Sequence, residues 1–121
     1  MKILSALFVF ADVLFAQHSH ATDVYQNPHD VLIDAIRNGH AEGILTGTIA
    51  QKFERQFHGN GPLLAEAKKL MTYKQNGCAR VEIDYTKQGV PTPNGVTEVK
   101  LKAEMNYCLD GRAPQSLEHA E

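Results

Sequence analysis

The chain has 121 residues, a length that favours one domain, and 43% of them are hydrophobic and 21% charged. Its formal net charge is −2, which argues against a nucleic-acid-binding protein, because such proteins carry a basic surplus or stripe. The same balance argues against electrostatic attraction to anionic lipid.

Residues 1–21 are typical of a secretory signal peptide. Lys2 supplies the positive charge, and an apolar run follows it, although Asp12 interrupts that run. Small residues at the −3 and −1 positions fit a cut after Ala21, and a cut after Ala16 is the alternative. The apolar run is too short to span a bilayer, which needs about 20 residues. We therefore expect a periplasmic or secreted protein; the other interpretation is an apolar first element of the fold.

A first amphipathic helix is predicted over residues 28–38. Asn27 is a good N-cap, and a proline follows it at the first helical position. Apolar residues recur along one face, and Gly39 ends the helix.

A second helix is predicted over residues 48–58, because its apolar residues recur at a spacing of three to four. Thr46 or Thr48 can cap it. Residues 39–47 carry three glycines and are predicted to form a loop between the two helices.

Residues 64–75 are ambiguous. They contain strong helix formers, and Pro62 could open a helix. A strand is the alternative, because a two-stranded sheet downstream would be marginal in water without a further partner.

An antiparallel hairpin is predicted from two alternating segments, residues 78–86 and 96–109. The segment between them holds two prolines and two glycines and is predicted to be a long loop. We expect the helices to cover the apolar face of the hairpin, so that the core includes Val81, Ile83, Val99, Leu101 and Met105.

Charge suggests the register of this hairpin. Three pairs of opposite charge face each other in one register: Arg80–Glu104, Glu82–Lys102 and Asp84–Lys100. A register shifted by two residues brings Cys78 opposite Cys108 but sets Glu82 against Glu104. A bulge near Arg80 would satisfy both.

Cys78 and Cys108 are the two cysteines of the chain, and both registers place them on the polar face near one end of the hairpin. Cysteines of an exported protein usually pair. The bond would close a loop of 30 residues, which in the chain-entropy model stabilises a domain by about 3–4 kcal/mol. The chain has no C-x-x-C motif, so we expect a structural disulfide.

The titratable residues form no recognisable catalytic or metal-binding motif. The histidines of the mature chain lack the i, i+4 spacing of a helical metal site: His29, His40, His58 and His119. Asp30 and Asp34 are interpreted as a polar helix face. We therefore expect no catalytic residue, no metal and no cofactor.

The proline-containing loop is the best local candidate for contact with a partner: Val90, Pro91, Thr92, Pro93 and Asn94. Prolines pre-order a loop and so lower the entropic cost of binding. A stiff connection without a binding role is the alternative.

Three segments together resemble a known family: G-I-L-T-G-T-I-A at residues 43–50, K-Q-N-G-C-A-R-V at residues 74–81 and M-N-Y-C-L-D-G at residues 105–111. The pattern is similar to KikA-like proteins, small exported proteobacterial proteins encoded in conjugative-transfer and type IV secretion clusters. The resemblance covers about residues 28–114. It implies a non-enzymatic periplasmic accessory protein, and it implies a strand over residues 65–73, although Ala, Glu and Lys replace β-branched residues there.

We therefore predict one α+β domain over residues 22–114, followed by a polar, frayed tail over residues 115–121. Two N-terminal helices are expected on one face of a three-stranded antiparallel sheet. The expected partner is another envelope or secretion-system protein, without nucleic acid or membrane insertion of the mature chain. The alternative function is an inhibitor or toxin-like domain that acts on an envelope enzyme.

Overall fold

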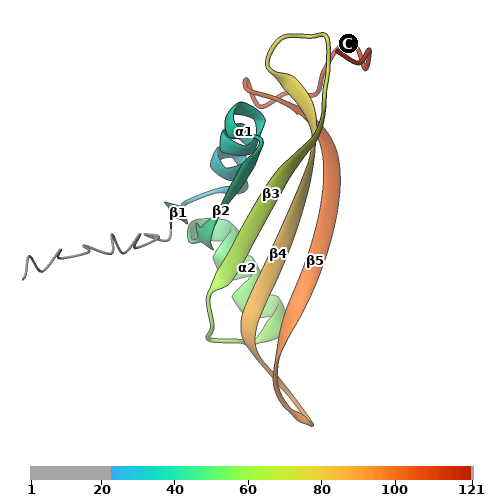
Figure 1. The fold of residues 1–121 in the computed structure, drawn as a ribbon. Coiled ribbons are helices and arrows are strands. Elements are labelled where there is room, and N and C mark those ends of the chain that lie inside the picture. The colour runs from blue at the N-terminus through green and yellow to red at the C-terminus, as the bar shows by residue number, and fades with distance from the viewer. Residues whose placement is uncertain (1–22, 121) are drawn as a thin grey trace, which may run out of the picture.

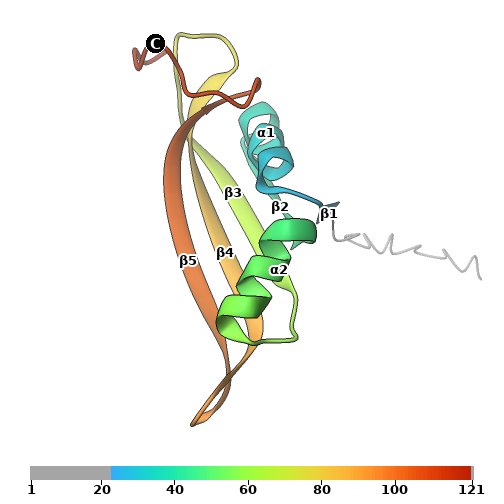
Figure 2. The ribbon, with the colours of Figure 1, turned by 180° about the vertical axis from the view of Figure 1, so that it is seen from behind.

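The computed structural model describes residues 23–120, so the predicted signal peptide lies outside the described residues. The fold is α+β, and its elements in chain order are β1 (Val24–Tyr25), α1 (Pro28–Asn38), β2 (His40–Leu45), α2 (Gly47–Phe57), β3 (Leu63–Thr72), β4 (Cys78–Thr92) and β5 (Gly95–Cys108). The five strands form one sheet in the order β1-β2-β3-β4-β5. β1 runs parallel to β2, and the other neighbours are antiparallel (Figure 1). Both helices lie on the same side of the sheet (Figure 2).

The prediction of three strands after two helices is wrong, because β1 and β2 precede and separate the helices. β2 occupies the glycine-containing segment that was expected to be a loop. Gly43 lies inside this strand, and a Cβ atom added there would lie 2.7 Å from a ring carbon of Tyr25. The glycine therefore serves the close approach of β1 to β2 rather than a turn.

Helix α1 has the predicted bounds and the predicted cap. The side chain of Asn27 accepts a hydrogen bond from the Asp30 backbone N–H at 3.1 Å. Gly39 ends the helix with φ +88°, and its N–H donates to the Ala35 carbonyl at 2.7 Å. The apolar face of the helix is buried against the sheet: Val31, Leu32, Ala35 and Ile36.

Helix α2 begins one residue earlier than predicted, at Gly47, and ends at Phe57. Thr46 is the N-cap residue, but its hydroxyl donates to the Tyr25 carbonyl at 3.1 Å instead of capping the helix. This bond ties the start of α2 to β1. On its inner side Phe53 packs against Tyr85, with the ring centroids 5.5 Å apart.

The strand predicted over residues 65–73 is present as β3. It pairs with β2 on one side and β4 on the other, so its backbone is hydrogen-bonded along both edges. Ala65 and Ala67 are buried on the side that the helices cover. Small side chains at these positions allow the helices to approach the sheet closely.

The hairpin turn is much shorter than the predicted loop. β4 continues to Thr92 and β5 starts at Gly95, which leaves only Pro93 and Asn94 in the turn. Beyond Lys87, β4 has no β3 partner in the described pairing, and an unpaired strand edge tolerates a proline such as Pro91.

A disulfide joins Cys78 to Cys108, which lie directly opposite each other with their Cα atoms 4.0 Å apart. This register continues without a bulge from Cys78 to Lys87 within the described β4–β5 pairing, so Glu82 faces Glu104. The register that matched opposite charges is therefore wrong by two residues.

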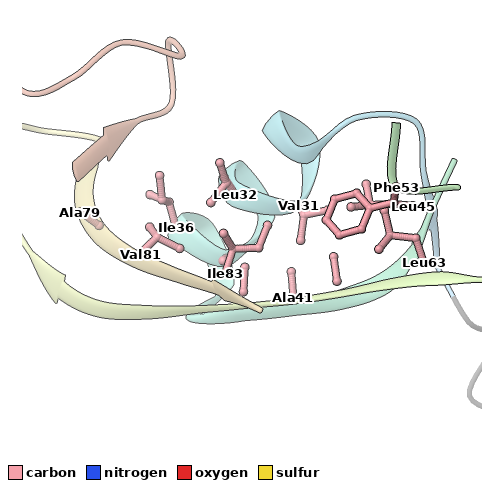
Figure 3. Packing of buried hydrophobic residues seen from close by; sticks show 13 residues of the cluster. Val31, Leu32, Ile36, Ala41, Leu45, Phe53, Leu63, Ala79, Val81 and Ile83 are labelled. Atoms are coloured by element: carbon pink, nitrogen blue, oxygen red, sulfur yellow. The ribbon is translucent and has the colours of Figure 1, made fainter. Parts of the chain in front are cut away.

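The core lies between the helices and the central strands (Figure 3). Val81 and Ile83 on β4 are fully buried, as predicted. Leu101 on β5 is 44% exposed, which corrects its predicted place in the core. Val99 and Met105 on the same strand are half-buried, because β5 lies at the margin of the surface that the helices cover.

The end of the chain is not frayed within the described residues. Lys74 N–H donates to the Glu118 carbonyl at 2.7 Å, and Ala120 N–H donates to the Thr72 carbonyl at 3.0 Å. The rings of Tyr73 and His119 lie 6.0 Å apart. The tail thus adds backbone pairing at the end of β3 that is close to the disulfide.

Candidate functional site

The face of the sheet opposite the helices, here called the open face, carries alternate residues of β2 to β5. One row across these strands consists of Glu42, Glu66, Asp84 and Lys102, and the next row consists of His40, Lys68, Glu82 and Glu104. A shallow hollow of about 820 Å³ lies over this face, with lysines at its margin: Lys68, Lys100 and Lys102. The open face is therefore a polar surface that carries both carboxylates and ammonium groups, with three carboxylates next to one another in the first row.

Several charged side chains of the open face form ion pairs with one another. Lys68 Nζ lies 3.1 Å from Glu66 Oε1, and His40 Nε2 lies 3.6 Å from the same oxygen. The hydrogen bond from Lys68 lowers the pKa of Glu66, and the same bond raises the pKa of Lys68. Lys102 Nζ lies 2.6 Å from Glu82 Oε1, and this bond raises the pKa of Lys102. Each shift favours the charged form of its group.

His40, Glu42 and Glu66 have ligand atoms within 4.8 Å of one another, a set of donors that can hold a divalent cation. The spacing of histidines along a helix does not predict this cluster, because its members come from two adjacent strands. The His-x-Glu pattern of β2 is the sequence signal for this cluster, because alternate residues of a strand lie on the same face. The Glu66 carboxylate is already bonded to Lys68, so the cluster as it stands is an ion-pair network.

The predicted partner-binding residues lie at the end of the β4–β5 hairpin, which extends past α2 (Figure 1). Val90 is buried and does not offer its side chain to a partner. The other four are exposed: Pro91, Thr92, Pro93 and Asn94. Thr92 fixes the turn, because its hydroxyl donates to the Gly95 carbonyl at 2.6 Å and accepts from Asn94 N–H at 3.3 Å.

The histidines of residues 23–120 have separate surroundings. His29 Nδ1 is hydrogen-bonded to the Tyr107 hydroxyl, and His58 follows the end of α2. His40 lies on the open face, and the ring of His119 lies beside the ring of Tyr73 at a tilt.

Asp34, one of the two carboxylates predicted to form a polar helix face, accepts a hydrogen bond from the Tyr25 hydroxyl at 2.8 Å. Burial, this hydrogen bond and the charge of Asp34 raise the pKa of Tyr25 to about 12. Asp34 thus has a structural role, because it joins α1 to β1.

None of the helices in the part of the chain that the structure describes is long and apolar enough to cross a membrane. Comparisons of the chain with protein-family models, with curated proteins and with solved structures find no match.

Proposed function

We propose that this chain is an exported, non-enzymatic accessory protein of conjugal transfer or type IV secretion, and that it acts in the periplasm by binding another envelope or secretion-system protein. The open face is the proposed binding surface. The observation that carries the proposal is the pattern of opposite charges around its shallow hollow.

The open face suits a protein partner. Its hollow has a volume of about 820 Å³, and the carboxylate row Glu42–Glu66–Asp84 lies in it together with lysines of β3 and β5. A row of carboxylates flanked by lysines selects a partner by electrostatic complementarity and fixes the orientation of the complex. A partner surface with basic side chains opposite the carboxylate row fits this pattern.

The direction of the pKa shifts supports binding over acid–base catalysis. A general acid or base requires a pKa close to the working pH, so a catalytic carboxyl has a raised pKa and a catalytic lysine a lowered one. On the open face Glu66 has a lowered pKa, and Lys68 and Lys102 have raised pKa values. These groups keep their charges near neutral pH, as an electrostatic interface requires.

The proposed location rests on residues 1–21 and on the disulfide. Cys78 and Cys108 form a bond that persists in oxidising compartments such as the periplasm. The link to conjugation and type IV secretion rests on the resemblance of the segments around both cysteines to KikA-like proteins.

An affinity pull-down from envelope extracts of conjugating cells tests the proposal, with the oxidised mature chain as bait. We expect one envelope or secretion protein that is lost with Glu42→Lys/Asp84→Lys, which reverses the charge of the carboxylate row on the open face. The same protein should be retained by the matched control Glu54→Lys, which reverses an exposed carboxylate on α2. Recovery of peptidoglycan fragments alone, or equal recovery by all variants, would contradict the proposal.

The alternative, an inhibitor of an envelope enzyme, is favoured by one observation. The hairpin end extends past α2, and Thr92 holds its turn in one conformation. A pre-ordered projection of this kind can enter an enzyme cleft at low entropic cost. Thr92→Ala in the same pull-down separates the two functions: a partner lost with this variant, but kept by the open-face variant, would favour the inhibitor.

A further inference from the structure

β5 is the last strand of the sheet, and along its outer edge it has no partner strand among residues 23–120 (Figure 1). The strand runs from Gly95 to Cys108. An edge of this length presents a row of unpaired N–H and C=O groups, which is a template for pairing with another strand. Proteins protect such an edge with a proline, a bulge or charged side chains. The segment Glu98–Tyr107 has no proline and no bulge in the described pairing, and it carries charges of both signs, which a second copy can match.

The hydrogen bonds at the disulfide end show which backbone groups point outward. Leu109 N–H donates to the Gly77 carbonyl at 2.9 Å, whereas Cys108 N–H turns to the Arg112 carbonyl at 3.0 Å. Hydrogen-bonded pairs alternate along an antiparallel ladder, so odd-numbered residues of β5 bond to β4. The even-numbered residues between Lys100 and Asn106 therefore direct their N–H and C=O groups to the free edge.

We propose that two copies of this chain pair their β5 edges antiparallel about a twofold axis at Ala103. The two sheets then form one continuous sheet, with both open faces on the same side. This inference does not depend on the proposed function.

Charge favours an axis at Ala103 or at Val99. Of these two, only the axis at Ala103 places Leu101 opposite an apolar residue, because an axis at Val99 would place it opposite Thr97. With the axis at Ala103, Lys102 of each copy faces Glu104 of the other, and these even-numbered residues form the hydrogen-bonded pairs. With the axis at Lys100, Leu101 or Lys102, a lysine faces a lysine, which is unfavourable.

The apolar side of β5 matches in the same register. Leu101 faces Met105 of the second copy, and Val99 faces Tyr107 of the second copy. All four side chains are only partly covered within one chain, and Leu101 is 44% exposed. Pairing would remove this apolar surface from water, which favours association.

Analytical ultracentrifugation of the oxidised mature chain tests the inference. We expect a dimer, and we expect Leu101→Glu to raise its dissociation constant about tenfold or more, because a carboxylate would face Met105 of the second copy. Val96→Glu is the matched control: Val96 is also an exposed apolar residue of β5, at 75% exposure, but it lies outside the proposed pairing. A monomer up to millimolar concentration, or equal loss of association by both variants, would overturn the proposal.

Cysteine cross-linking tests the register independently of these variants. Opposed residues at a position without backbone hydrogen bonds are close enough for a disulfide. Ala103→Cys should therefore give a covalent dimer under mild oxidation, and Val99→Cys should not. Cross-linking by Val99→Cys alone, which would place the axis at Val99, or by neither variant, would overturn the pairing about Ala103. Such a result would leave the pull-down test of the proposed function unaffected.

Discussion

Glu82 and Glu104 lie directly opposite each other on β4 and β5, yet each has a cation within hydrogen-bond distance. Lys102 Nζ lies 2.6 Å from Glu82, and Arg80 Nη2 lies 2.9 Å from Glu104. Both ion pairs cross the ladder diagonally, over a distance that long side chains can reach. Two of the three predicted pairs of opposite charge therefore meet, in a register that also aligns the two cysteines, whereas Lys100 lies 3.5 Å from Glu98 instead of pairing with Asp84.

Loss of the Lys102 ammonium should destabilise the chain, because the Glu82 carboxylate would lose its ion-pair partner while it still faces Glu104. The Glu82 side chain is only 15% exposed, so water replaces the lost partner poorly. We expect Lys102→Met to lower the midpoint of urea unfolding in dilute solution. Lys100→Met is the control and should change it little, because Lys100 is 71% exposed. Equal effects of the two variants would contradict this account of the diagonal pair.

Removal of the disulfide should cost a large part of the stability. The bond closes a loop of 30 residues, for which the chain-entropy model gives about 3–4 kcal/mol. Cys78→Ser/Cys108→Ser, compared with the oxidised chain in urea, measures the loss. Mass spectrometry of the native protein provides the prior check, since two free thiols would rule out the covalent link.

Gly43→Ala should destabilise β1 and β2 by about 1–3 kcal/mol, the usual cost of overpacking a close contact. The added methyl group would lie 2.7 Å from a ring carbon of Tyr25 and closer still to the Asp23 carbonyl. Glu42→Ala, at the neighbouring exposed position, should change the free energy of unfolding by less than about 0.5 kcal/mol. Thermal unfolding of both variants makes the comparison, and equal stabilities would show that Gly43 has no packing role.

Tyr25 should lose its contribution to stability only at strongly alkaline pH. Its pKa is about 12 in the folded chain and about 10 in an unfolded one, so folding favours the neutral hydroxyl. The contribution is complete below pH 10 and is lost as the pH rises toward 12. Absorbance of tyrosinate during alkaline titration should show a late component that Tyr25→Phe removes. If the late component survives in Tyr25→Phe, another tyrosine is responsible for it.

Local signals predicted α1 because its boundaries depend on neighbouring residues alone. Asn27 caps the helix and Gly39 ends it, and both act through their own backbone and side chain. β3 shows the opposite case. Its composition favours a helix, but strands on both sides supply its hydrogen bonds, so the tertiary environment overrides propensity.

Glycine and proline caused the two main errors. Gly43 suggests a loop when only its neighbours in sequence are considered. In the structure it lies in a strand, where the ring of Tyr25, distant in the sequence, leaves no room for a side chain. Pro91 suggested a loop, whereas it lies where β4 has no β3 partner among the described residues.

The candidate site was predictable only in part. Alternation along β4 and β5 predicted a polar face, and this face exists. The carboxylate row of Glu42, Glu66 and Asp84 was not predictable, because it requires β2 to be a strand and requires the registers of two further pairings.

The order of the strands has a consequence for biosynthesis. Ribosomes make α1 and α2 before β3 and β4, although these later strands supply a large part of the apolar surface that covers the helices. Cys78 likewise meets Cys108 only when almost the whole chain has been made. The core is therefore expected to be completed only after β4 has been made, and until then part of the apolar surface of the helices stays exposed to water.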